Sequence, residues 1–128
     1  MTMETEPTVF VVDDDPAIQD SLAVLMQTLH LPAEFYSSAR EFLDVYDPSR
    51  PGCLLLDIRM PGSGFSLLKE LSARESPLPV IVITGHGQDK TKDEAIKLGA
   101  VAYFEKPFDV SELCECIRQM IDSSSEAT

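Results

Sequence analysis

A fivefold alternation constrains the fold of this 128-residue chain more than any other feature. Short, mostly apolar runs alternate with segments whose apolar residues recur at helical spacing. The five runs are residues 9–12, 33–36, 53–56, 80–83 and 101–104. Runs without strict apolar–polar alternation are typical of parallel strands that are buried on both faces. Right-handed crossovers between such strands predict a doubly wound α/β fold, in which helices cover both faces of an open five-stranded sheet.

Capping residues mark the ends of the helices between these runs. Three N-terminal signals occur, namely Asp15 with Pro16, Ser38 with Glu41, and Asp109 with Glu112. The last helix is expected to turn one apolar face inward, made of Val110, Leu113, Cys114, Ile117 and Ile121. We expect one domain over residues 8–122, after a disordered or extended segment at 1–7. Residues 123–128, with three serines in a row, are expected to be the start of a linker or a disordered tail.

The chain carries a net charge of −12, from 22 acidic and 10 basic residues. Nucleic acids and anionic membranes would repel such a surface, so we expect the domain to bind neither directly. A cation or a basic protein surface is the favoured partner. The apolar runs are too short to cross a bilayer, and the acidic N-terminus does not resemble a secretory signal. We therefore expect a cytoplasmic protein whose three cysteines are reduced.

Polar residues follow four of the predicted strands. Asp13 and Asp14 follow the first strand, Asp57 the third and Thr84 the fourth, while Lys106 comes shortly after the fifth. The carboxyl ends of parallel strands meet at one edge, where open α/β sheets bind their ligands. Each of these residues alone has an ordinary structural explanation, such as a helix start or a turn. Their convergence on one edge instead predicts a functional site.

Three carboxylates at this edge require a neutralising cation or a protonated carboxyl group. Each pair of charges repels by about 4 kcal/mol at an effective dielectric constant near 20. Mg²⁺ suits hard oxygen ligands that leave positions open for water and a phosphate. A metal, a carboxylate, a hydroxyl and an ammonium together favour phosphoryl transfer. Asp57 is then the expected nucleophile, and Lys106 stabilises the charge of the phosphoryl group.

Four segments resemble the signature segments of response-regulator receiver domains from two-component systems. They are Val-Val-Asp-Asp-Asp at 11–15, Leu-Asp-Ile-Arg-Met-Pro-Gly at 56–62, Ile-Thr-Gly-His-Gly at 83–87 and Phe-Glu-Lys-Pro-Phe at 104–108. The resemblance spans residues 8–121 and implies the flavodoxin-like strand order 2-1-3-4-5. The sequences of the last two segments most resemble those of the nitrogen-fixation regulators. These proteins usually carry a LuxR-type helix-turn-helix output domain.

The resemblance implies chemical roles for the residues at this edge. Asp57 would accept a phosphoryl group from the phosphohistidine of a sensor histidine kinase. The ligands of Mg²⁺ would be Asp13, Asp14, Asp57 and the backbone carbonyl of Arg59. Lys106 would pair with the phosphoryl group, and its peptide bond to Pro107 would be cis.

The resemblance also implies a switch. Thr84 and Tyr103 would be the switch pair, in which the hydroxyl moves toward the phosphoryl group and the aromatic ring turns inward. Arg59 and His86 occupy positions that tune the lifetime of the phosphorylated state in this family. The face formed by the fourth helix, the fifth strand and the fifth helix would repack, control an output domain or a downstream protein, and offer a homodimer contact. Charges there would pair across the dimer or remain an ordinary solvated surface: Lys90, Lys92, Asp93, Glu94 and Arg118.

The loop after Asp57 departs from the family pattern. It usually runs Met-Pro-Gly-x-x-Gly, whereas Met-Pro-Gly-Ser-Gly at residues 60–64 is one residue shorter. The spacings from Asp57 to Thr84 and to Lys106 are short by the same single residue, so a local deletion explains them all. This loop lies beside the acceptor, so its length bears on the metal geometry and on the rate of dephosphorylation.

Three alternatives share this fold or this chemistry. A receiver-like binding module would act without phosphorylation. An aspartate-nucleophile phosphohydrolase normally has Asp-x-Asp followed by Thr or Val, whereas Pro16 and Ala17 follow the aspartates here. A flavodoxin-like cofactor binder would place a Ser-, Thr- or Gly-rich phosphate loop after the first strand, where this chain has acidic residues. We expect a receiver that assists its own phosphorylation and dephosphorylation, and not an enzyme with a separate substrate.

Overall fold

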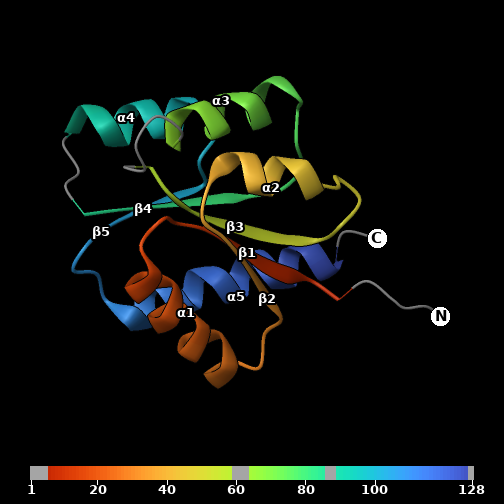
Figure 1. Ribbon diagram of the computed structural model, residues 1–128, viewed down its shortest axis with the longest axis vertical. Coiled ribbons are helices and arrows are strands. Elements are labelled where there is room, and N and C mark those ends of the chain that lie inside the picture. The colour runs from red at the N-terminus through yellow and green to blue at the C-terminus, as the bar shows by residue number, and fades with distance from the viewer. Residues whose placement is uncertain (1–5, 59–63, 86–88, 127–128) are drawn as a thin grey trace.

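The computed structural model describes residues 6–58, 64–85 and 89–126, with side chains except at 89, 90 and 123–126 (Figure 1). Strands and helices alternate along the whole of this part of the chain. The elements are β1 (Thr8–Val12), α1 (Pro16–Thr28), β2 (Ala33–Tyr36), α2 (Ala39–Val45), β3 (Gly52–Asp57), α3 (Gly64–Ala73), β4 (Val80–Thr84), α4 (Asp89–Lys97), β5 (Ala102–Glu105) and α5 (Val110–Glu126). Among the described residues, no helix has the length and apolarity that a membrane span requires.

The strands form one parallel five-stranded sheet with the order β2-β1-β3-β4-β5. This order confirms the doubly wound fold and the flavodoxin-like topology that the sequence predicts. The chain reverses direction across the sheet between β1 and β3, so the carboxyl ends of these two neighbouring strands form the switch point at which such folds bind ligands. Val12 pairs with Leu56 in this register, which brings the residues after β1 level with Asp57.

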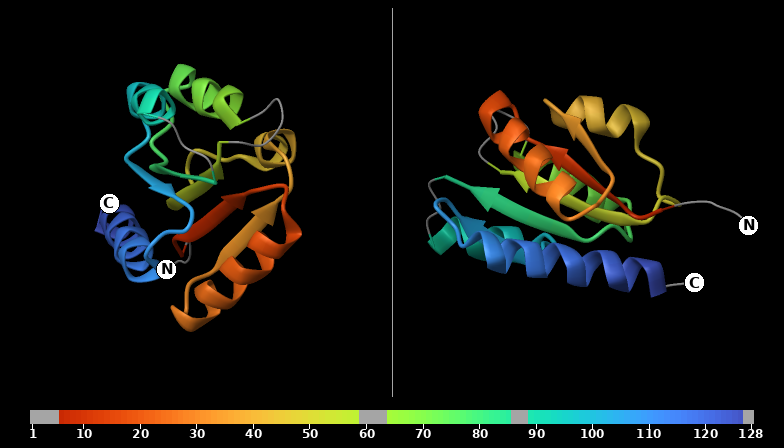
Figure 2. Two further views of the ribbon diagram at one scale, coloured as in Figure 1. Left: turned by 90° about the vertical axis from the view of Figure 1, so that its left-hand side faces the viewer. Right: turned by 90° about the horizontal axis from the view of Figure 1, so that it is seen from below.

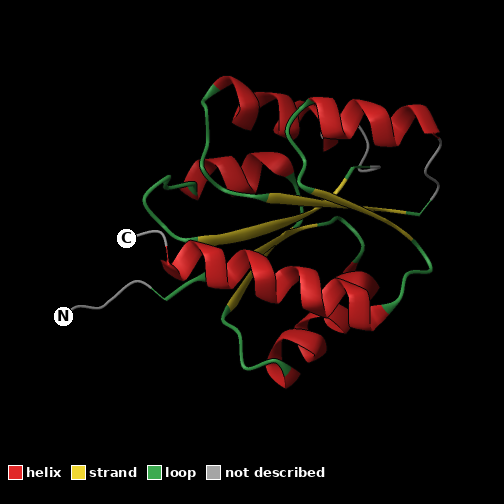
Figure 3. Ribbon diagram, turned by 180° about the vertical axis from the view of Figure 1, so that it is seen from behind, coloured by secondary structure: helices red, strands yellow, loops and turns green. Residues whose placement is uncertain are grey.

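Two helical layers enclose the sheet (Figures 1 and 3). Side chains on alternate strand positions point to opposite faces, so each strand feeds two cores. One face packs against α2, α3 and α4 through buried residues that include Phe42, Leu68 and Ala95. The other packs against α1 and α5 through Met26 and Ile117 among others. Both layers are apolar at the sheet, which is why the strand sequences show no period of two.

Local signals explain where the elements begin. The Asp15 side chain accepts a hydrogen bond from the N–H of Ala17, and the Ser38 hydroxyl accepts one from the N–H of Glu41. The Asp109 carboxylate accepts the N–H groups of Ser111 and Glu112, so all three predicted caps form. Gly52 opens β3 with φ of +144°, and a Cβ atom there would lie 1.9 Å from the carbonyl oxygen of Thr8. Only glycine has a low-energy conformation in that backbone region, and only glycine allows the close approach to β1.

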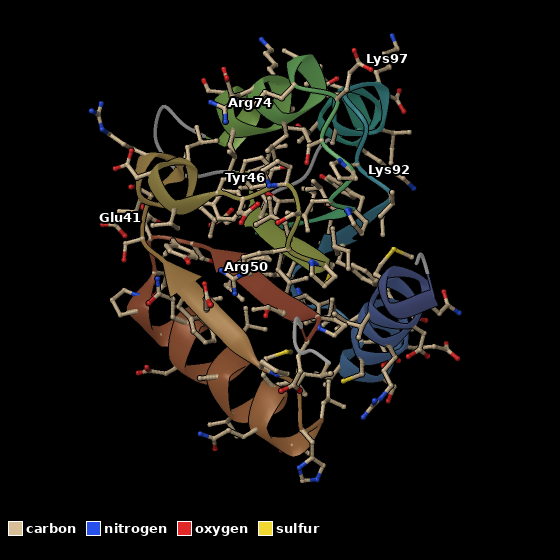
Figure 4. The ribbon with its side chains drawn as sticks, turned by 90° about the vertical axis from the view of Figure 1, so that its right-hand side faces the viewer. Glu41, Tyr46, Arg50, Arg74, Lys92 and Lys97 are labelled. Atoms are coloured by element: carbon tan, nitrogen blue, oxygen red, sulfur yellow. The ribbon has the colours of Figure 1, made fainter. Side chains whose placement is uncertain are left out.

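An ion pair fastens the edge strand β2. The Arg50 guanidinium donates to both carboxylate oxygens of Glu34, at 3.1 and 2.7 Å, and lies 4.9 Å from the centre of the Phe10 ring. The Tyr36 hydroxyl donates to the same carboxylate at 2.6 Å. Figure 4, which views the amino ends of the strands, shows Arg50 near the middle of the molecule and Lys97 at its periphery. These contacts hold the loop before β3 against the sheet, far from the predicted site.

The last helix differs from the expectation in two respects. It continues to Glu126, past the boundary predicted at residue 122, because serine only mildly disfavours a helix and no Gly or Pro interrupts the sequence there. Its buried face is also rotated. Cys116 and Met120 pack against the core, whereas the Val110 side chain is 53% exposed. Val110 lies in the first turn, and Cys114 lies about 100° around the helix from the buried Leu113.

Candidate functional site

The carboxyl ends of β1 and β3 bring three carboxylates together. Asp57 is the last residue of β3, and Asp13 and Asp14 directly follow β1. Each offers a carboxylate oxygen, and these three atoms all lie within 4.8 Å of one another. Asp13 is buried, Asp57 is half-buried and Asp14 is exposed, so the cluster opens to solvent on the Asp14 side. Figure 2 (left) looks onto this edge of the sheet.

Asp13 is held by contacts on both of its carboxylate oxygens. Oδ1 accepts the N–H of Asp15 at 2.8 Å, and Oδ2 lies 3.8 Å from the Lys106 ammonium. The pKa of Asp13 is raised to about 6, and burial is the largest cause. The Asp15 N–H and the Lys106 charge act to lower this pKa, while the charges of Asp57 and Asp14 act to raise it. Desolvation therefore outweighs the favourable contacts, and the cluster favours a neutralising cation.

The donor set fits Mg²⁺. Three carboxylates are hard oxygen ligands, and an octahedral ion with bonds of about 2.1 Å separates opposite ligands by about 4.2 Å. The three carboxylate oxygens lie within 4.8 Å of one another, which is comparable with this separation, so one ion can be held among them, with a carboxylate binding directly or through water. Asp13, with Oδ1 already engaged by Asp15, is the carboxylate best placed to bind through water.

Lys106 and Thr84 occupy the same edge on the next two strands. Lys106 follows β5, and its N–H donates to the carbonyl oxygen of Thr84 at 2.8 Å. Thr84 ends β4 and is fully buried. A Cβ atom on the neighbouring Gly85 would meet no described atom within 4 Å, so there is open space beside Thr84. The Lys106–Pro107 peptide bond is cis, the isomer that the family resemblance implies.

Tyr103 lies on β5 and shares a face with Thr84. The register pairs Tyr103 with Val82, and Val82 and Thr84 are two residues apart on β4, so all three side chains point toward the α3–α4 layer. The Tyr103 ring packs against that core, and its hydroxyl is buried without a hydrogen-bond partner among the described residues. Burial raises the pKa of Tyr103. The predicted switch residues thus project from adjacent strands into one layer.

Two predicted site residues, Arg59 and His86, lie outside the described residues, as do positions 60–63 of the shortened loop. The end of that loop is described. A Cβ atom on Gly64 would lie 2.2 Å from the carbonyl oxygen of Ile58, so glycine permits α3 to begin directly against the residue that follows Asp57. A pocket of about 220 Å³ lies elsewhere, between α3 and α4 beside Val80, and contains none of the predicted site residues.

Sequence reasoning missed one residue next to the site. Gln19, in the second turn of α1, donates from its side-chain nitrogen to the carbonyl oxygen of Asp13 at 2.6 Å. The same nitrogen lies 3.4 Å from the Tyr36 carbonyl oxygen and 3.3 Å from the Ser37 hydroxyl. A polar residue at a half-buried helix position carries no periodic signal, so only the folded arrangement identifies this contact.

Comparison with known proteins places this geometry in a family. The family described as "Response regulator receiver domain" matches residues 9–118. The transcriptional regulatory protein FixJ of Azorhizobium caulinodans is 45% identical over 119 residues, covering 92% of this chain and 56% of that protein. The response regulator protein TodT of Pseudomonas putida is 40% identical over 111 residues, covering 86% and 49%. This chain therefore spans about half the length of these curated relatives.

Solved structures agree with the family match. The crystal structure of FixJ-N has a TM-score of 0.83 and 37% sequence identity, and covers 92% of this chain and 95% of that chain. The structure of the response regulator StyR has a TM-score of 0.87 and 37% identity, over 95% of this chain and 62% of that chain. Both likenesses cover more than nine-tenths of this chain.

Proposed function

Because the chain belongs to the response regulator receiver domain family, we propose that it is a phosphorylation-driven switch whose acceptor is Asp57. The observation that carries the proposal is the placement of this carboxylate. Asp57 ends a central strand, with two further carboxylates within 4.8 Å. The Lys106 ammonium lies 3.8 Å from one of these, Asp13. A rigid strand end holds the nucleophile, the neighbouring carboxylates can hold a cation, and the Lys106 ammonium is complementary in charge to a phosphoryl group.

Phosphotransfer uses each of these residues differently. Asp13, Asp14 and Asp57, together with the Arg59 carbonyl, would hold Mg²⁺, which supplies charge neutralisation at the phosphoryl oxygens. An oxygen of Asp57 bonds to phosphorus as the phosphorus–nitrogen bond of the kinase phosphohistidine breaks, and the imidazole leaves with the electron pair. The Lys106 ammonium then pairs with a phosphoryl oxygen. The donor is a sensor histidine kinase, and the chain assists its own phosphorylation without being an enzyme for a separate substrate.

The switch follows from the shared face of Thr84 and Tyr103. The Thr84 hydroxyl moves toward the phosphoryl group, and the Tyr103 ring, which already packs against the α3–α4 layer, shifts with it. This movement biases the surface formed by α4, β5 and α5 between two states. That surface is the one that controls an output domain or a downstream protein. The FixJ relative is a transcriptional regulatory protein, which supports transcription control as the output. A cytoplasmic location without direct DNA or membrane contact by this domain is part of the proposal, and the net charge of −12 supports it.

A phosphorylation-dependent homodimer through the same surface is part of the proposal. Three apolar side chains there are exposed by about half, namely Ile96 on α4, Val101 before β5 and Val110 on α5. Arg118, one of the charged residues expected to pair across this dimer, is not oriented toward it. The Arg118 guanidinium donates to the carbonyl oxygen of Leu29 at 3.0 Å and so faces the end of α1 rather than the dimer surface.

The test is intact-mass spectrometry after incubation with acetyl phosphate, with and without Mg²⁺. We expect the wild-type chain to gain one phosphoryl group only with Mg²⁺, Asp57→Asn to gain none, and the exposed control Asp44→Asn to behave as wild type. Absence of any gain would instead indicate a binding module that acts without phosphorylation. Sustained release of phosphate from small esters would indicate a phosphohydrolase.

A further inference from the structure

Gln19 connects three parts of the chain that are far apart in sequence. It lies on α1, and its side-chain nitrogen approaches the carbonyl oxygen that ends the β1 segment at Asp13, at 2.6 Å. It also approaches the carbonyl oxygen of Tyr36 at 3.4 Å and the hydroxyl of Ser37 at 3.3 Å, both at the end of β2. One amide nitrogen thus joins the first helix to the ends of two neighbouring strands.

The segment that Gln19 contacts carries two of the three clustered carboxylates. The Asp13 N–H already donates to the Tyr36 carbonyl oxygen at 3.1 Å, and the Asp13 carboxylate accepts the N–H of Asp15 at 2.8 Å. The Asp13 carbonyl offers a further point at which the turn into Asp14 can be fixed. Gln19 supplies the donor for that carbonyl. Asp14 itself is exposed.

We propose that Gln19 is a positioning residue for the metal-binding carboxylates. Like charges drive Asp13, Asp14 and Asp57 apart, and the amide of Gln19 holds the turn that keeps the first two near the third. The cluster is then assembled before a cation arrives. This inference rests on the proposed function, in which the three carboxylates hold Mg²⁺. Groups that orient metal ligands without touching the metal typically change affinity by about 10- to 100-fold when they are replaced.

The experiment is a Mg²⁺ titration of the unphosphorylated chain, followed by amide chemical shifts. Gln19→Met keeps the length and charge of the side chain but removes the donor. Gln27→Met is the matched control, because Gln27 is an exposed glutamine on the same helix. Gln19→Asn keeps the amide group but shortens the side chain by one methylene. This variant replaces Gln19→Met in the titration if Gln19→Met does not fold. Thermal unfolding without Mg²⁺ separates stability from affinity.

We expect the Kd for Mg²⁺ to rise about 10-fold in Gln19→Met and in Gln19→Asn, and to stay unchanged in Gln27→Met. Acetyl phosphate should still phosphorylate the Gln19 variants when Mg²⁺ is saturating. A variant that melts earlier but binds Mg²⁺ as tightly as wild type would overturn the inference, because Gln19 would then only stabilise the fold. Failure of the wild-type chain to bind Mg²⁺ would remove the proposed function and this inference together.

Discussion

The carboxylate of Asp13 experiences opposing electrostatic effects at the site. Its carboxylate is buried and lies among two like charges, yet it accepts an N–H and has Lys106 3.8 Å away. Burial is the largest of these effects and raises the pKa of Asp13 from 3.8 to about 6. A raised pKa means that the ionised group costs folding stability. Without a cation, the ionised Asp13 carboxylate at the site therefore lowers the free energy of unfolding.

Asp13→Asn should therefore stabilise the metal-free chain. Asparagine keeps the acceptor for the Asp15 N–H and removes the buried charge, so the free energy of unfolding at pH 7.5 should rise by roughly 1–3 kcal/mol. In the wild type, the ionised Asp13 carboxylate lowers the free energy of unfolding. This loss is absent below pH 3.8, grows as the pH rises, and is complete above a pH of about 6. The gain should consequently vanish near pH 4 in chemical denaturation, and Mg²⁺ affinity should fall at neutral pH. A loss of stability at pH 7.5 would mean that Lys106 outweighs burial.

At the scale of elements, three helices end in the same way. The second residue after the helix adopts a left-handed conformation in each case, namely His30 at φ 58°, Glu75 at φ 53° and Gly99 at φ 106°. At the end of α1, the His30 N–H donates to Gln27 and the Leu31 N–H to Met26, which is the Schellman pattern of hydrogen bonds. Of these three positions, only Gly99 has glycine, the residue that the left-handed conformation favours.

His30→Gly should stabilise the chain by about 0.5–1 kcal/mol, because glycine adopts the left-handed conformation without the steric cost of a Cβ atom. His30 is exposed and its side chain makes no hydrogen bond among the described residues. The measurement is urea unfolding of His30→Gly beside His30→Ala, which keeps the Cβ atom and should not gain. Equal stability of the two variants would show that backbone strain at the end of α1 is negligible.

The same elements show what the sequence could and could not predict. The strands and the convergence of Asp13, Asp14 and Asp57 follow from the apolar runs and from the rule that parallel strands end at one edge. The strand order follows from the family resemblance. Pro32 marks the end of the first helix in the sequence, but the left-handed conformations of His30 and Glu75 could not be predicted, because neither position has glycine. The contacts of Gln19 with Asp13 and of Arg118 with Leu29 were also invisible, since long polar side chains reach across the fold without leaving a period in the sequence.

At the scale of the whole molecule, the charge is unevenly distributed. The segment from residue 64 to residue 97 carries five basic and five acidic residues, so the net charge of −12 arises from the rest of the chain. Figure 4 shows Lys92 and Lys97 on α4. On α5, Glu112 and Glu115 are exposed. A symmetric dimer through α4, β5 and α5 would bring the lysines of one copy toward the acidic helix of the other.

Phosphorylation should therefore produce a dimer that depends on the apolar centre of this surface. Ile96→Glu places a charge on the apolar centre of this surface and should weaken the association of the phosphorylated chain at least 10-fold in sedimentation. Val24→Glu is the control, because Val24 is an exposed valine on α1, outside the surface. A phosphorylated wild type that sediments as a monomer would contradict the dimer and leave the phosphoacceptor untouched.

The most direct test of the central claim is to locate the phosphoryl group. Borohydride reduces an aspartyl phosphate to homoserine, which peptide mass spectrometry assigns to a position. After reaction with acetyl phosphate and Mg²⁺, the account predicts homoserine at residue 57 alone, and none when Mg²⁺ is removed. Homoserine at residue 13 or 14, or a phosphorylated chain that yields no homoserine, would contradict the assignment of Asp57.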